Sequence, residues 1–206
     1  MTSTLAETIH NGVDVADFFD TIDPVGTMEP AGVAAVGAMA AVQTTPRAAW
    51  FQFRASNEWV GGAHSRGTIH DYYGAGEERS HERSFHFDAD HPALLVGRDK
   101  GPTPVEFVLH ALAACLTAGL ASLAAARGIT LTDVRSTISG DIDLNGILGR
   151  TPDARNTCQH ISIYFAVKGE APAAKLRQLV AESKAHSAVY DILTNSVPIT
   201  IEVETD

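Results

Sequence analysis

The segment 101–128, GPTPVEFVLHALAACLTAGLASLAAARG, constrains the fold more than any other part of the chain. It opens with a Gly-Pro-Thr-Pro turn and closes with Arg-Gly, which are typical helix boundaries, because proline fits a first helical turn and glycine follows a last one. Between them, apolar residues recur at steps of three and four, which predicts one long helix. Its other faces are mostly alanine, so we expect the helix to be buried nearly all round. Cys115 lies in the middle of the apolar stripe.

Strand-like patterns lie on both sides of this helix. The strands expected before it are 50–55, 63–73 and 85–87, with a turn at Gly61-Gly62 and a loop at 73–78. The elements expected after it are strands at 133–143 and 161–167, a loop at 145–157, helices at 172–185 and 188–193, and a strand at 198–203 that closes the sheet. This order predicts an α+β fold rather than repeated βαβ units.

The chain is long enough for one domain with a sizeable core and an added segment. Residues 1–47 contain an Ala- and Gly-rich stretch with little amphipathic pattern. We therefore expect an N-terminal extension at 1–47 and a single folded domain at 48–206.

Charge and cysteine content limit the possible partners. A net charge of −10 argues against nucleic acid or an anionic membrane surface as a partner. Glu106 and His110 argue against a membrane-spanning role for the long helix. With only two cysteines and no signal-peptide pattern, we expect a protein of the reducing cytoplasm.

The nine histidines do not form a recognisable metal motif. Several fall between His64 and His91, but none shows the close spacing of metal ligands, and no cysteine pairs with them. We expect no metal and no cofactor.

Three segments together resemble the OsmC/Ohr family, named for osmotically inducible protein C and organic hydroperoxide resistance. They are 101–115 (GPTPVEFVLHALAAC), 140–149 (GDIDLNGILG) and 187–195 (SAVYDILTN). The resemblance extends from about Trp50 to the C-terminus. It implies an intertwined homodimer, with antiparallel sheets around two long central helices, and a thiol peroxidase with active sites at the dimer interface.

The family's attacking cysteine falls on Cys115, and its chemistry needs a thiolate. The alternative for Cys115 is a small hydrophobic core residue. The family's resolving cysteine falls on Ser187, which cannot form a disulfide. Cys158 is the other cysteine of the chain, 43 residues after Cys115, and a strand residue with no redox role is the alternative for it.

The resemblance also implies an arginine and a glutamate that hold the thiolate. Arg66 is the candidate arginine, although Ala63 directly follows the Gly61-Gly62 pair, and Arg54 is the alternative on the preceding strand. Glu106 is the candidate glutamate.

The position of Glu106 leaves its role open. It lies nine residues before Cys115, which puts it on the far side of an ideal helix. Glu106 could equally be a first-turn acid favoured by the helix dipole, or could pair with His110.

Two functions follow from this pattern. In the first, the protein is a stress-response hydroperoxide reductase, in which Cys115 forms a sulfenic acid that an external thiol reduces. In the second, it is a non-catalytic binding protein of the same fold, with an apolar small-molecule pocket at the dimer interface. The missing resolving cysteine favours the second function, and the retained Cys115 favours the first.

Overall fold

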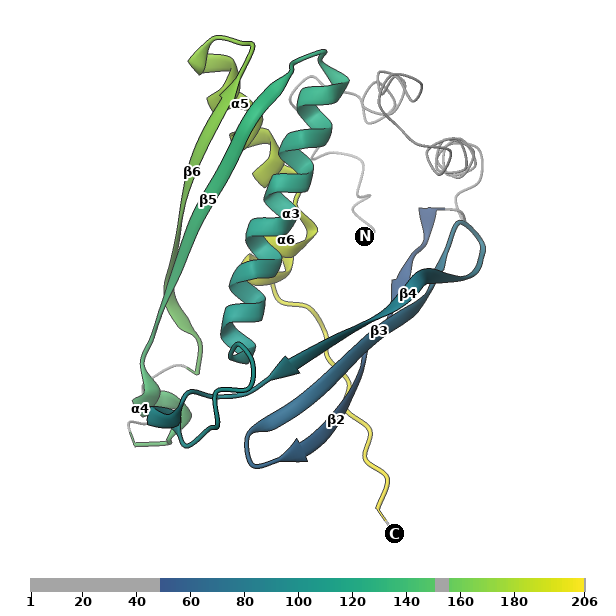
Figure 1. The fold of residues 1–206 in the computed structure, drawn as a ribbon, viewed down its shortest axis with the longest axis vertical. Helices are drawn as coiled ribbons and strands as arrows, with labels where there is room; N and C mark the ends of the chain where they lie inside the picture. Colours follow the sequence, from purple (N-terminus) through teal and green to yellow (C-terminus); the bar gives the residue numbers. More distant parts are fainter. Residues whose placement is uncertain (1–48, 151–155, 206) are drawn as a thin grey trace, which may run out of the picture. The chain divides into compact units, whose positions relative to one another are not determined.

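The computed structural model describes residues 49–150 and 156–205. The expected extension at 1–47 lies outside these residues. These residues divide into two compact units: 49–103 with Ala125–Arg127 form the first, and Pro104–Ala124 with 128–150 and 156–205 form the second. Both units contain antiparallel strands, and the second also contains helices (Figure 1), so the expected α+β class is confirmed.

The first unit is an antiparallel sheet built around one strand, β3 (His64–Gly74). The strands β1 (Gln52–Phe53), β2 (Ser56–Gly61) and β4 (Glu77–Ala89) all pair with it. The predicted turn at Gly61-Gly62 joins β2 to β3, and Gly62 has the positive φ of 62° that favours glycine.

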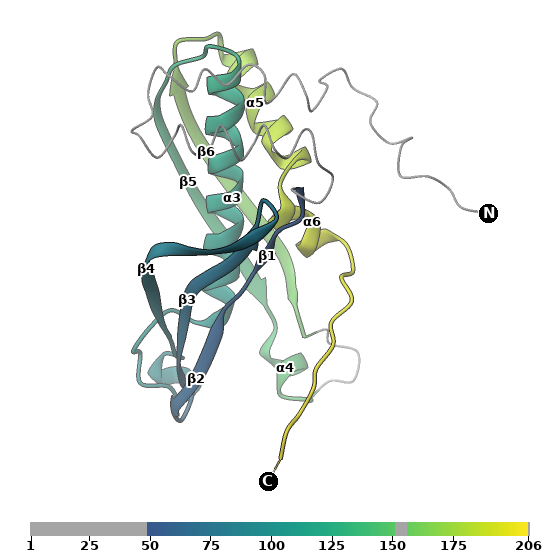
Figure 2. The same ribbon diagram turned by 90° about the vertical axis from the view of Figure 1, so that its right-hand side faces the viewer.

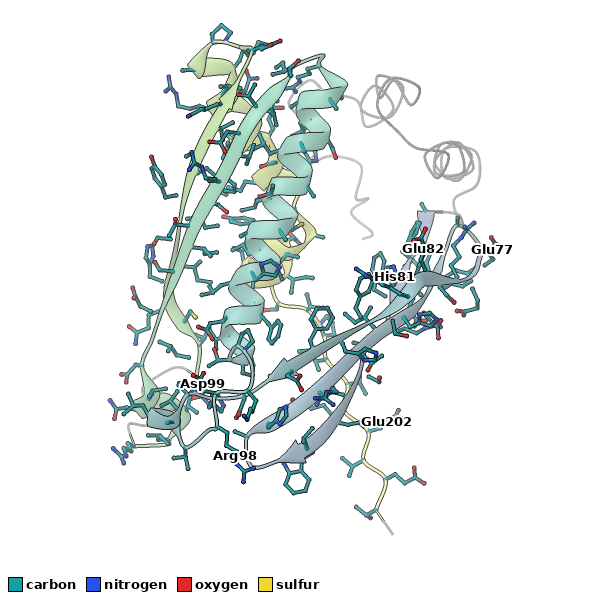
Figure 3. The ribbon with its side chains drawn as sticks, in the orientation of Figure 1. Glu77, His81, Glu82, Arg98, Asp99 and Glu202 are labelled. Atoms are coloured by element: carbon teal, nitrogen blue, oxygen red, sulfur yellow. The ribbon has the colours of Figure 1, made fainter. Side chains whose placement is uncertain are left out.

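Two expectations for this sheet were wrong. The first strand is only two residues long, and β4 runs for 13 residues instead of the short strand 85–87 preceded by a loop. The charged sequence at the start of β4 hid the strand, because both of its faces are largely solvent-exposed there. Glu77, His81 and Glu82 lie on this part of β4, near its turn with β3 (Figure 3).

Asp90 fixes the loop that follows β4. Its side chain is 1% exposed and accepts hydrogen bonds from the backbone N–H groups of His91, Arg98 and Lys100, at 2.8, 3.1 and 3.2 Å. Burial acts to raise the pKa of Asp90, but these three donors hold it below its usual range. The Asp90 carboxylate therefore stabilises the loop up to Lys100, which includes the short 3-10 helix η2 (Ala93–Leu95).

Gly101 has a steric role at the end of that loop. A Cβ atom there would collide with the backbone carbonyl oxygen of Asp88. The first glycine of the Gly-Pro-Thr-Pro turn is thus required for close backbone approach, in addition to marking the helix boundary.

The second unit contains the long helix α3 (Pro104–Ala126) and the hairpin of β5 (Leu131–Ile142) and β6 (Cys158–Gly169). Its shorter helices are α4 (Leu144–Ile147), α5 (Ala173–Ala185) and α6 (Ala188–Thr194). Figures 1 and 2 show the hairpin and α5 running alongside α3. The predicted long helix, strand pair and two later helices are confirmed, whereas α4 replaces part of the expected loop at 145–157.

One face of α3 provides the core of this unit. Leu112, Leu116, Leu120 and Leu123 are buried, at steps of three and four residues. The expectation that α3 is buried all round was wrong for the single chain, since the Val108 side chain is 41% exposed. By length and composition α3 could also cross a membrane, but this is weak evidence, because core helices of soluble proteins pass the same test.

A small-residue contact joins α3 to α5. A Cβ atom at Gly119 would lie 3.4 Å from the Cβ of Ser183, which is itself buried. Ser183 donates its hydroxyl to the Val180 carbonyl at 2.9 Å, so its polarity is satisfied within α5. The glycine and the serine allow the two helix backbones to approach closely, with Leu179 fully buried on α5.

The C-terminal segment does not form the expected closing strand. No strand is present at 198–203, and Ile199 and Ile201 are 84% and 82% exposed. Glu202 extends from this segment in Figure 3. The alternating pattern is typical of a strand, but the segment does not pair with any strand in the described part of this chain.

Candidate functional site

In the second unit, the side chain of Ser187 contacts the side chain of Cys115. The Ser187 Oγ lies 3.2 Å from the Cys115 Sγ and donates a hydrogen bond to it. Ser187 is only 5% exposed, and Cys115 is half-buried in the middle of α3. Two residues 72 positions apart in sequence therefore form one polar contact within an apolar region.

The fold of α6 holds Ser187 in this orientation. Ser187 is the N-cap residue of α6, and its Oγ accepts a hydrogen bond from the Tyr190 backbone N–H at 3.1 Å. Because the oxygen accepts from Tyr190, its own proton is available for the sulfur of Cys115. The cap and the cysteine contact thus share one hydroxyl group.

Cys158 lies elsewhere in the same unit. It faces Ile142 in the register of β5 and β6, and its sulfur is 3.2 Å from the position of a Cβ at Gly140. That same position is 3.1 Å from Leu109, which precedes Cys115 by six residues, or about 9 Å along a helix axis. Both cysteines are free thiols, and the neighbour that the structure gives Cys115 is a serine hydroxyl.

The two candidate arginines belong to the first unit, and each has a carboxylate partner there. Arg66 binds Asp88 on β4 at 2.9 Å, and His64 contacts the same carboxylate at 2.8 Å. The hydrogen bond from His64, and next to it that from Arg66, holds the pKa of Asp88 below its usual range against the opposing effect of burial.

Arg54, the alternative arginine, forms a two-point contact with Glu78. Both distances are 2.8 Å, and this hydrogen bonding lowers the pKa of Glu78 from its ordinary value. Arg54 therefore has a carboxylate partner within the first unit.

Glu106 occupies the first turn of α3. Nine residues separate it from Cys115, which corresponds to about 14 Å along the helix axis. Within one chain the two side chains therefore belong to different turns of α3.

No metal centre is present in the described part of the chain. Within residues 49–150 and 156–205, no three His, Cys, Asp or Glu side chains are grouped as metal ligands.

An apolar cavity of about 580 Å³ lies in the second unit, between α3, β6 and α5. Leu116, Ile163, Phe165 and Leu176 are among its lining residues. Its volume falls in the range of small-molecule sites, which is roughly 300–1,000 Å³. An apolar pocket was expected for the binding alternative, and this one is formed by a single chain.

The family model for OsmC-like proteins matches residues 97–202, which is more than half of the chain. The chain belongs to the OsmC-like protein family. The matched region includes Cys115, Cys158, Ser187 and Glu106 and begins after both candidate arginines. The predicted family is thereby confirmed, whereas the roles of individual residues remain predictions.

Solved structures agree with this family in fold. An OsmC-like protein from Mycoplasma pneumoniae is 15% identical, with a TM-score of 0.55, over 70% of this chain and 89% of that one. A protein from Psychrobacter arcticus assigned to osmotic stress and detoxification response is 11% identical, with a TM-score of 0.51, over 68% and 87%. At these identities the similarity concerns the fold.

An organic hydroperoxide resistance protein OsmC from Legionella pneumophila also matches, with 16% identity and a TM-score of 0.44, over 69% of this chain and 88% of that one. No curated protein matches the chain significantly.

Sequence reasoning identified Ser187 only as the residue at the resolving position and missed its contact with Cys115. The available signal was the N-cap pattern, since serine directly before a short helix is typical of a cap. The cavity gave no such signal, because its lining depends on how β6, α5 and α6 pack against α3.

Proposed function

We propose that this OsmC-like protein is a thiol-dependent reductase of organic hydroperoxides that uses Cys115 in a one-cysteine mechanism. The contact of 3.2 Å between Ser187 Oγ and Cys115 Sγ carries the proposal. It puts a hydroxyl donor beside the one cysteine of the central helix, at the position where the family pattern has a resolving cysteine. Some members of the family are named as hydroperoxide resistance proteins.

The chemistry follows from this neighbour. The Cys115 thiolate attacks the peroxide, the O–O bond breaks, and the alkoxide leaves as the alcohol after taking up a proton, so that Cys115 becomes a sulfenic acid. Ser187 cannot form a disulfide with it. An external thiol therefore condenses with the sulfenic acid to give a mixed disulfide and water, and a second thiol releases Cys115.

In this proposal Arg66 and Glu106 retain the roles that the family pattern implies for them. The guanidinium group of Arg66 favours the thiolate, and Glu106 helps the arginine to hold it. Arg66 forms an ion pair with Asp88, and this carboxylate partly compensates the positive charge that would stabilise a thiolate. Substituting Asp88 tests this point, because a less compensated Arg66 is expected to raise the reactivity of Cys115.

A homodimer is part of the proposal. Large apolar side chains are exposed in both units, and the C-terminal segment exposes alternating Val197, Ile199, Ile201 and Val203. Single chains rarely expose apolar surface on this scale. Light scattering on the purified protein tests the assembly: we expect twice the mass of one chain, and a shift toward the single-chain mass in Ile201→Asp.

The central experiment measures oxidation of Cys115. Reduced protein is mixed with cumene hydroperoxide and, separately, with hydrogen peroxide, and a sulfenic-acid trap is followed by intact mass. We expect one trapped sulfenic acid per chain, formed faster with cumene hydroperoxide, retained in Cys158→Ser and lost in Cys115→Ser. A rate no greater than that of free cysteine would contradict the proposal.

That outcome would favour the second candidate, a non-catalytic binding protein. The observation that favours it is the apolar cavity of about 580 Å³, whose lining does not include Cys115.

A further inference from the structure

We propose that the second unit contains a binding site for an apolar chain with a terminal carboxylate, whose head group is held by Lys184. The site consists of two adjoining cavities along α5, of about 580 and 330 Å³. The Cys115 thiol is not among the lining residues of either cavity, although its hydrogen-bond partner Ser187 lines the smaller one, and the proposal does not depend on peroxide reduction.

The two cavities differ in chemical character. Apolar side chains from α3, β6 and α5 dominate the lining of the larger one, including Leu116, Phe165 and Val180. The smaller one has a mixed and more polar lining, which includes the side chains of Ser187, Thr194 and Asn195. An apolar space that continues into a polar one suits a molecule with an apolar chain and a polar head.

Lys184 lies where the two cavities meet. It lines both, as do Ala181 and Tyr190. Its Nζ atom lies 4.9 Å from the centre of the Tyr190 ring, a cation–π contact that holds the ammonium group at this junction. A chain in the larger cavity would therefore present its end to a positive charge.

The charges around the cavities favour an anionic head group. Arg177 and Lys184 are the two charged residues of the larger cavity, both are cations, and neither forms an ion pair with a carboxylate of the described residues. Asp191 is the acidic residue of the smaller cavity, and its carboxylate accepts a hydrogen bond from Asn195 at 2.8 Å. The net charge of the chain is −10, so a positively charged side chain at the cavities is the group to which an anionic head group would bind.

The test is a calorimetric titration of the full chain with dodecanoate below its micelle concentration, with dodecanol as the uncharged chain of the same length. We expect one saturable dodecanoate site per chain, and about tenfold weaker binding of dodecanol. Lys184→Ala should weaken dodecanoate about tenfold and leave dodecanol unchanged. Lys175→Ala, on the same helix but outside both cavities, is the matched control and should bind like the wild type.

Two further variants locate the ligand. Val180→Trp should fill the larger cavity and abolish binding of both probes, with circular dichroism confirming that the variant is folded. Cys115→Ser should bind dodecanoate normally, so the site can be present even if peroxide reduction fails. Absence of saturable dodecanoate binding overturns the proposal, and a larger loss in Arg177→Ala than in Lys184→Ala overturns the assignment of the head group. If the C-terminal segment or a second chain fills the cavity, saturable dodecanoate binding will be absent.

Discussion

The hydroxyl of Ser187 donates a hydrogen bond to the sulfur of Cys115 over 3.2 Å, and the same oxygen caps helix α6 by accepting the Tyr190 N–H. This hydrogen bond links Cys115 of α3, for which redox chemistry is proposed, to the start of α6, 72 residues later. It also explains how a chain with serine at position 187 keeps the local geometry that a resolving cysteine would need.

Ser187→Cys is expected to introduce an intramolecular disulfide with Cys115. The Ser187 Oγ and Cys115 Sγ are already in contact, so a sulfur at that position is within reach of a disulfide after a small adjustment. Peroxide treatment should then give a loss of two hydrogen atoms by intact mass and, after digestion, a disulfide-linked pair of peptides containing positions 115 and 187. The Cys158→Ser background serves as the control. A sulfenic acid that persists in Ser187→Cys would contradict this geometry.

Ser187→Ala should lower the free energy of unfolding by about 1 kcal/mol, because it removes the N-cap of α6 and leaves the Tyr190 N–H without its partner. Ser187→Thr keeps the hydroxyl and should lose less. Urea unfolding of both variants measures the difference. Equal losses in the two variants would mean that the size of residue 187, rather than its hydroxyl, matters for stability.

The hydroxyl should also affect reactivity. Without its donor, the Cys115 thiolate is less stabilised, so Ser187→Ala should alkylate with iodoacetamide more slowly at neutral pH, and Ser187→Thr should stay closer to the wild type. A purely structural role for Ser187 would leave the alkylation rate of the folded protein unchanged.

The helices and the β5–β6 hairpin were predictable from sequence because their signals are local. Apolar steps of three and four indicated α3 and α5, and alternation indicated β5 and β6. The long strand β4 was not predictable from sequence, because the charged and exposed residues at its start lack apolar alternation. The C-terminal segment shows the opposite failure, since its alternation suits a strand but no strand forms at 198–203 in the described chain. Local patterns report which faces can be buried, but not what covers them.

The candidate site divides in the same way. Cys115 and Ser187 could be singled out from motifs, whereas their hydrogen bond depends on how α6 meets α3. The role proposed for Lys184 had no local signal, because it follows from the meeting of two cavities rather than from neighbouring residues in sequence.

Asp90→Asn should destabilise the loop after β4 in a pH-dependent way. The pKa of Asp90 in the folded protein lies below its ordinary value of 3.8, so its contribution to stability is present above about pH 3.8 and is lost as the pH falls through the folded pKa. The melting temperature of Asp90→Asn should therefore lie below that of the wild type at neutral pH, and the difference should shrink below pH 3.8. Asp99→Asn, on the exposed part of the same loop, is the matched control and should show no such convergence.

Gly119 tests the packing of α3 against α5. Its added Cβ would meet the Cβ of Ser183 at 3.4 Å, which is an ordinary van der Waals contact, so Gly119→Ala should fit and gain up to about 1 kcal/mol of helix stability. Gly119→Leu has no space for its further carbons and should cost about 1–3 kcal/mol relative to alanine, because it forces the two helices apart. Urea unfolding followed by circular dichroism measures both variants. If leucine stabilises the protein as much as alanine does, α3 and α5 do not pack through Gly119 and Ser183, and the contact that positions α5, and with it Ser187 beside Cys115, must be assigned to other residues.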